Sequence, residues 1–226
     1  MTAPAPLTGF ADDMGGGNAA LVLRLRKMAV LIADEDAPPI TTIVNATGTA
    51  LSIPGQYRKV GYLGKDDGAS LAPAIETSDS TAYGQSQPIN RYVDSTSFTA
   101  GFTMKETSKT VLEAYNAVDL SAVRANKDTY EVSFDIPDQP EVRNPRLLII
   151  GQHRDGADAI FVAQFLPRAT IDDIGEQTMS DTEDYVYPVT YTALVDATLG
   201  TSRRPFFAGP GMKKLGDTPM GFELAA

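Results

Sequence analysis

The chain contains no cysteine, no tryptophan and a single histidine, His153. Without cysteine it forms no disulfide and no thiolate metal site, so its stability depends on packing or on assembly. One histidine is too few for histidine-paired zinc sites. A Ser-His-Asp arrangement would need His153 in a cleft beside a nucleophile, but it lies at a predicted turn and no nucleophile-elbow motif is present. We therefore expect no catalytic residue, no cofactor and no metal.

Long apolar runs and phosphate-binding motifs are missing too. No stretch of 18 or more apolar residues and no cleavable signal pattern occurs, so we expect a soluble chain that is not exported by a standard secretory route. The glycine run at 15–17 lacks the Gly-Lys-Ser/Thr ending of a phosphate loop. Basic residues number 19 against 29 acids, for a net charge of −10. Such a surface repels phosphate backbones, which argues against ordinary nucleic-acid binding.

Strand signals dominate what is present. Residues 97–104 and 130–136 alternate apolar and polar side chains with a period of two, which predicts two half-buried antiparallel strands. The apolar sets are Phe98, Ala100, Phe102 and Met104 in the first stretch and Tyr130, Val132, Phe134 and Ile136 in the second. Residues 146–152 and 159–166 are apolar on both faces and flank a turn. They predict a hairpin in the middle of a sandwich or under another subunit.

The remaining elements are shorter. A helix is predicted over 108–117, capped by Thr107 or Ser108 and too short to be stable unless it packs on the sheet. Strands are predicted over 28–33, 57–63 and 185–195, with a hairpin turn at 65–68. Periodicity leaves 19–27 open between strand and helix. Together these strands and the helix predict a mainly β (α+β) fold, a two-sheet antiparallel β-sandwich with one short flanking helix.

Four polar or irregular segments lie within or beside the predicted 19–200 domain. The loop at 77–90 is rich in Ser, Thr and Gln around Tyr83, and long loops in compact domains are usually functional. Residues 171–184 carry only acidic charges, which predicts a solvated loop or a surface facing something negative. The ends, 1–18 and 201–226, predict extended arms. Phe206 and Phe207 in the second arm would need to dock on a neighbour.

The order of motifs over residues 61–116 resembles the major tail subunits, or tail tube proteins, of long-tailed, non-contractile bacteriophages. A Gly-Tyr-Leu strand end at 61–63, the Asp67-Gly68 turn, acidic Glu76, the alternating strand and the capped helix through 112–115 follow in the family's order. The similarity is looser over 161–200, where 187–190 looks like the family's closing strand, and absent from both arms. No single motif is diagnostic, so the resemblance rests on this order.

The resemblance implies a non-enzymatic structural virion protein, assembled in the host cytoplasm, whose hexameric rings stack into a hollow tube for genome ejection. Six copies would join their sheets into an inner barrel of about 24 strands, roughly 45 to 50 Å across. DNA would pass without specific binding, because six copies at −10 carry about −60 per ring. Expected partners are the tape measure, tail terminator and distal tail proteins, and no membrane insertion is expected.

The resemblance also assigns expected contacts to the segments predicted above. The 77–90 loop would meet the next ring, and the acidic segment would line the lumen or form a loop. The corresponding residues are Glu76, Asp79, Tyr83 and Gln85 for the inter-ring contact; Asp172, Asp173 and Glu176 for the acidic lumen or loop; and Phe206 and Phe207 for arm docking. The alternative is a monomeric carbohydrate- or ligand-binding β-sandwich. A hydrolase using paired carboxylates comes third, without the aromatic sugar platform that tryptophan supplies.

Overall fold

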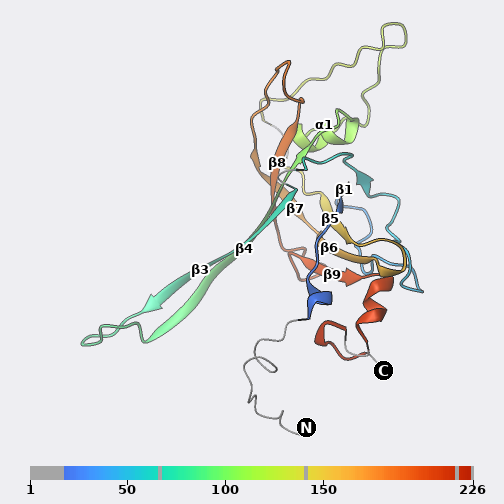
Figure 1. Ribbon diagram of the computed structural model, residues 1–226. Helices are drawn as coiled ribbons and strands as arrows, with labels where there is room; N and C mark the ends of the chain where they lie inside the picture. The colour runs from blue at the N-terminus through green and yellow to red at the C-terminus, as the bar shows by residue number, and fades with distance from the viewer. Residues whose placement is uncertain (1–17, 66–67, 140–141, 217–218, 225–226) are drawn as a thin grey trace.

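The computed structural model describes residues 18–65, 68–139, 142–216 and 219–224 (Figure 1). The strands are β1 (Lys27–Ala33), β2 (Arg58–Lys59), β3 (Ala69–Ser80), β4 (Asn90–Met104), β5 (Arg146–His153), β6 (Ile160–Leu166), β7 (Ala169–Ile174), β8 (Tyr187–Ala193) and β9 (Arg204–Ala208). The helices are α1 (Lys109–Asn116) and the 3-10 turns η2 (Ala19–Leu21), η3 (Gly156–Asp158), η4 (Pro210–Leu215) and η5 (Pro219–Gly221). The strands form two antiparallel sheets, β2-β1-β5-β6-β9 and β3-β4-β8-β7. The predicted sandwich is confirmed.

The main core lies between the two sheets. The apolar residues of the alternating stretch in β4, including Phe98 and Phe102, are buried there as predicted. Leu147 and Ile149 of β5 reach the same core from the other sheet. The Phe102 ring stacks on Tyr191 of β8 with 5.9 Å between centroids. Period-two alternation therefore places β4 with one face inward, as expected for a half-buried strand.

A second core covers the other face of the five-stranded sheet. Leu148 and Ile150 of β5 point away from the main core and pack there with Phe165 of β6. Ile40 and Tyr57, from the connection between β1 and β2, close this layer over them. Because β5 is covered on both faces, it can be apolar at every position. The covering layer belongs to the same chain and not to another subunit.

Helix α1 begins and ends at the expected positions. The Ser108 side chain accepts a hydrogen bond from the amide of Val111, and Ala117 ends the helix in the left-handed conformation. Val111 packs on the main core. Glu113 is buried and accepts a hydrogen bond of 2.7 Å from Arg58 of β2. The helix is thus held to both sheets by packing and by one ion pair, which compensates for its short length.

Three segments differ from what the sequence predicts. Both ends of the predicted 77–90 loop are strand: β3 continues to Ser80 and β4 starts at Asn90, so residues 81–89 connect them. Conversely, 130–136 pairs with no strand in the described ranges, and Tyr130 is 82% exposed. Within 19–27 the structure shows no long helix, and only Lys27 belongs to a strand, because η2 is followed by an extended stretch until β1 begins at Lys27.

The predicted arms also need correction. The C-terminal arm, 201–226, starts as strand β9, which pairs with β6 and completes the five-stranded sheet. The N-terminal arm, 1–18, lies outside the described residues except for Asn18. Residues 66 and 67 of the predicted hairpin turn lie outside them as well, while Gly68 has a positive φ of 59°. That value fits the left-handed backbone expected of a glycine in such a turn.

Candidate functional site

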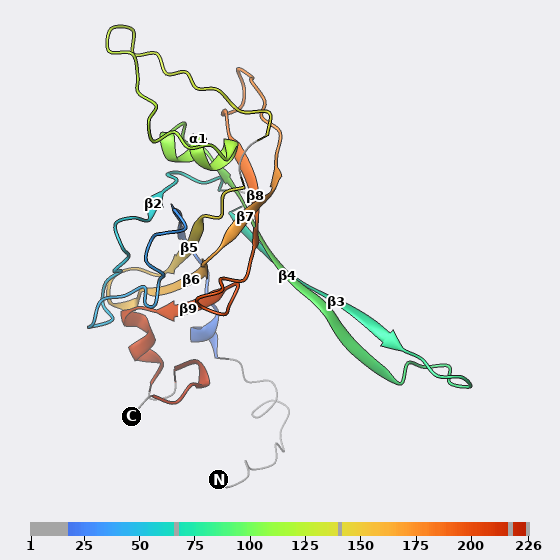
Figure 2. The same ribbon diagram turned by 180° about the vertical axis from the view of Figure 1, so that it is seen from behind.

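A two-stranded ribbon projects from the four-stranded sheet. Strands β3 and β4 pair along their whole length, but β8 pairs with β4 only over residues 99–104. The outer half of β4 therefore has β3 as its one neighbour, and the hairpin stands clear of the body (Figures 1 and 2). Its residues are exposed, and Leu71, Ile75 and Val93 are 39%, 66% and 62% accessible. Isolated two-stranded ribbons are only marginally stable in water, so an assembled partner would strengthen this one.

The ribbon has two chemically different faces. Directly paired residues share a face, and Phe98 pairs with Pro73 while Thr96 pairs with Ile75. Leu71, Pro73 and Ile75 thus continue the core-facing side of the sheet beyond the core. The opposite face carries small and hydroxyl side chains with one acid: Ser70, Ala72, Ala74, Glu76 and Ser78 opposite Gly101, Thr99, Ser97, Ser95 and Tyr92. The apolar face is the one that requires cover.

Polar contacts fix the outer end of the ribbon. Arg91 binds Asp79 through two hydrogen bonds of 2.6 and 3.0 Å, and the Arg91 hydrogen bond lowers the pKa of the Asp79 carboxyl. The register shifts between Glu76 and Thr77, which leaves Asp94 as the extra residue of a bulge, where it accepts from Ser78 at 2.8 Å. A bulge increases local twist and re-aims the strands beyond it.

The predicted inter-ring contacts divide between strand and tip. Glu76 and Asp79 lie in β3, where Glu76 accepts a hydrogen bond from Ser95 at 2.9 Å and Asp79 pairs with Arg91. Tyr83 and Gln85 lie in the connection between β3 and β4, and the Tyr83 side chain is fully exposed. The structure thus brings all four to one projection, but spread along it.

The predicted acidic residues lie on or beside an edge strand. Asp172 and Asp173 are exposed in β7, and Glu176 is exposed just after it. Asp173 pairs with Thr190 of β8, so it shares the outer face of the four-stranded sheet with that hydroxyl. A shallow groove of about 190 Å³ runs over this face, lined by Ser70, Gly101, Phe102, Thr103, Asp173, Gly175, Pro188, Val189 and Thr190. The face is polar, weakly acidic and without lysine or arginine in the groove.

The two phenylalanines of the predicted C-terminal arm lie in β9. Phe206 pairs opposite Ala163 of β6 and packs against the second core. Phe207 points the other way and is 44% exposed. Only one of the two thus needs cover from a neighbour. Sequence reasoning missed this because pairing between β6 and β9 depends on a distant part of the chain.

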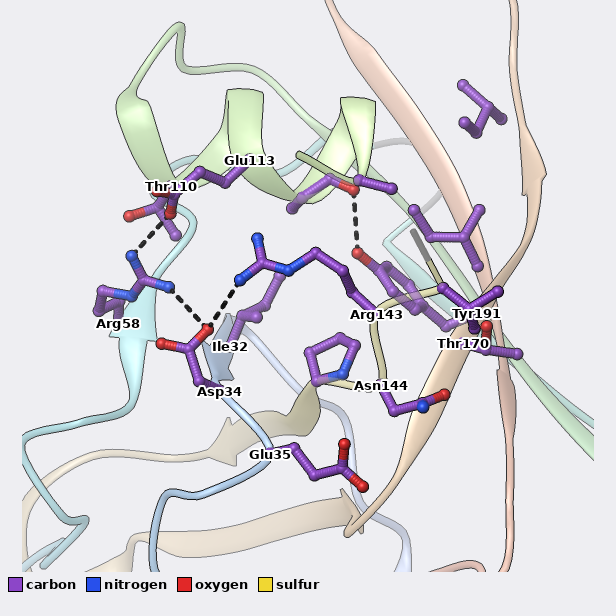
Figure 3. A pocket seen from close by; sticks show the side chains of 16 residues that line it. Ile32, Asp34, Glu35, Arg58, Thr110, Glu113, Arg143, Asn144, Thr170 and Tyr191 are labelled. Carbon is purple, nitrogen blue, oxygen red and sulfur yellow. Dashed lines mark hydrogen bonds and ion pairs between the residues drawn. The ribbon is translucent and has the colours of Figure 1, made fainter. Parts of the chain in front are cut away.

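A pocket of about 470 Å³ lies beside α1 (Figure 3). Arg58 and Arg143 both approach Asp34, at 3.6 and 3.4 Å, and Arg58 also binds Glu113 at 2.7 Å. Burial raises the pKa of the Tyr191 hydroxyl, which stays protonated. The described lining residues include no histidine, and Glu35 pairs with Arg168 outside the lining at 3.4 Å. This network joins β1, β2, α1 and the segment before β5 and presents no nucleophile beside a base.

His153, at the end of β5, is held by the backbone of Arg24, whose amide lies 3.0 Å from its Nδ1. In the described part of the chain, no group of three or more histidine, aspartate or glutamate side chains is placed to hold a metal ion. No helix within the described ranges is both long and apolar enough to cross a membrane.

Residues 28–202 match a protein family described as phage tail tube protein. A comparison with curated protein sequences finds no match. Among solved structures, a chain of the anti-feeding prophage baseplate is similar at 8% identity, with 86% of this chain and 99% of that chain covered and a TM-score of 0.43. An Hcp protein is similar at 9% identity, with 79% and 98% covered and a TM-score of 0.30.

Proposed function

Because this chain belongs to the phage tail tube protein family, we propose that its copies form hexameric rings that stack into the hollow tube through which phage DNA is ejected. Its role is structural. In this proposal the virion is that of a phage with a long, non-contractile tail, and the tube assembles in the host cytoplasm. The tape measure, tail terminator and distal tail proteins would contact its lumen and two ends.

The observation that carries the proposal is the four-stranded sheet with its open margins. Strands β3 and β7 form the two edges of this sheet, and each has an unpaired outer side within the described chain. Edge strands readily pair with another chain. If β3 of one copy pairs with β7 of the next, six copies close a barrel of about 24 strands and no edge remains.

The ribbon supports the same arrangement. Its apolar face, with Leu71, Pro73 and Ile75, extends past the subunit's own core and would be covered by a neighbouring copy. Its polar face and the outer face of the four-stranded sheet, with Thr190 and Asp173, would then line the lumen. A hydroxyl-rich wall with acids and few cations holds no phosphate backbone, so DNA would slide past it.

Light scattering coupled to size exclusion tests the proposal on the purified chain. A concentration series should yield species whose mass is a multiple of six subunits of 24.1 kDa, followed by rods in the void volume. The alternative, a monomeric ligand-binding sandwich, requires a single 24.1 kDa species at every concentration. That second result would reject the tube.

A further inference from the structure

The two ends of the body differ from each other. The connections 117–139 and 175–186 lie beyond α1 and β8 at one end of the molecule, whereas β9, η2 and η4 lie at the other (Figures 1 and 2). We call 117–139 and 175–186 the acidic end, and 18–27 and 203–216 the basic end. The ribbon leaves the body between them and belongs to neither. The two ends therefore form opposite faces that separate neighbours could meet.

The charges of these ends are opposite. The acidic end holds nine acids and two bases, and the basic end holds seven bases and no acid. The described segments beside the basic end add Asp155, Asp158 and Glu223, and Lys27 and Lys214 pair with the first two. A chain of net charge −10 thus carries a concentrated positive surface at one end. Such segregation steers association between unlike surfaces and opposes contact between like ones.

Many of these charges have no partner of opposite sign. Within the described ranges, Glu131, Asp181 and Glu183 form no ion pair, and neither do Arg24 and Arg26; all five are exposed. At the acidic end Asp184 is an exception, because Lys105 binds it at 2.8 Å. Unpaired charges of opposite sign at the two ends are available to pair between copies.

Both ends also expose apolar side chains among the charges. Tyr130 and Val132 at the acidic end are 82% and 55% exposed. Val22, Leu25 and Phe207 at the basic end are 73%, 43% and 44% exposed. Apolar anchors surrounded by charged side chains are the usual composition of a protein interface. This composition would also explain the strand-like alternation of 130–136, which pairs with no strand among the described residues.

We propose that copies of this chain dock head to tail, with the acidic end of one on the basic end of the next, so that charge sets the polarity of stacking. The occupant of each end is a second copy, because the two ends complement each other in sign and each would repel its own kind. A head-to-tail contact does not close on itself and extends into a filament. This inference rests on the proposed tube and adds which surfaces join successive rings.

A charge-reversal experiment tests it. The acid-reversed variant carries D181K and E183K, the base-reversed variant R24E and R26E, and a third variant carries all four. Each two-site variant should form rings but need about tenfold more protein to form tubes at 0.1 M salt. The four-site variant lowers the net charge of both ends, from −7 to −3 at the acidic end and from +7 to +3 at the basic end, so it should need more protein than either two-site variant. D36K and K59E, on exposed residues outside both ends, serve as controls and should leave assembly unchanged.

The outcomes separate the two proposals when rings and tubes are counted by negative-stain microscopy and sedimentation. Wild-type tubes together with two-site variants of unchanged tube length overturn the head-to-tail assignment and leave the tube intact. A four-site variant that forms tubes at the wild-type protein concentration also overturns it. A wild-type chain that stays monomeric overturns the proposed function, and this inference with it.

Discussion

Ile75 and Phe98 lie on the same face of the β3–β4 ribbon, yet Phe98 is 5% exposed and Ile75 is 66% exposed. The face is continuous, but the subunit's own core ends between them. An apolar strand face that extends beyond the core of its own subunit is suited to contact with another chain. The first prediction tests this surface directly.

Placing a charge on the apolar face should block assembly and leave the subunit folded. Ile75→Asp buries a carboxylate only if a neighbour covers the ribbon, and burial of an unpaired charge costs several kcal/mol. We expect no rods by light scattering and an unchanged melting temperature for the monomer. Ala74→Asp puts the same charge one residue earlier in β3, on the opposite face of the ribbon, and should allow rods to form. Equal behaviour of the two variants would contradict the face assignment.

Reversing an acid on the proposed lumen face should create DNA retention. Asp173→Lys adds six cations per ring next to the hydroxyl of Thr190, where the wild-type wall repels phosphate. Assembled variant tubes should bind duplex DNA at 50 mM salt and release it at 200 mM, measured by co-sedimentation. Asp172→Lys and Glu176→Lys test the other two predicted acids in the same way. Asp36→Lys, away from this sheet, is the matched control. DNA binding equal to that of the control would place these acids away from the bore.

Removing the carboxylate of Asp196 should destabilise the sandwich. Asp196 is buried, accepts from Arg146 at 3.1 Å and from the amides of Thr198 and Leu199 at 2.8 and 3.0 Å. Asp196→Ala leaves Arg146 buried without its partner, so we expect a loss of about 3 kcal/mol in the free energy of unfolding. Asp196→Asn keeps an acceptor for both amides and should lose about half as much. Urea denaturation measures both, and equal losses would contradict the role of the amides.

The same residue should make stability depend on acid pH. The Leu199 amide, followed by the Thr198 amide and Arg146, lowers the pKa of Asp196 below its ordinary value, against the opposing effect of burial. A lowered pKa means that the contribution is complete above the unfolded-state value of about 3.9 and is lost as the pH falls through the folded-state value. The stability difference between wild type and Asp196→Asn should therefore shrink below pH 4. A difference that is constant from pH 7 to pH 2.5 would contradict this linkage.

Local sequence patterns predict the elements whose partners are close in sequence, and those that need only an apolar surface to pack on. The alternation in β4, the two-faced apolar hairpin of β5 and β6, and the cap of α1 at Ser108 each depend on a few adjacent residues. The structure confirms each of them. The strands need only apolar side chains on the faces that meet a core, and the cap needs only a hydroxyl beside the first helical amides.

Other features depend on partners that local sequence does not specify. The sequence predicts a loop for the outer part of the ribbon because Thr77, Ser78 and Ser80 are polar and lie beyond the core of the subunit. The local sequence predicts an unpaired tail at 203–207. The structure places these residues in and beside β9, which pairs with β6 about 40 residues away in the chain. The pattern at 130–136 has the period of a strand, but these residues pair with no strand in the described part of the chain.

Electron cryo-microscopy of the assembled protein tests the central claim most directly, because it shows which strands pair between copies. The account predicts six-fold rings in which β3 of one copy hydrogen-bonds to β7 of the next, with the apolar face of the ribbon covered by a neighbour. A self-contained monomer, or an assembly in which the β3 and β7 edges stay open to solvent, would contradict it.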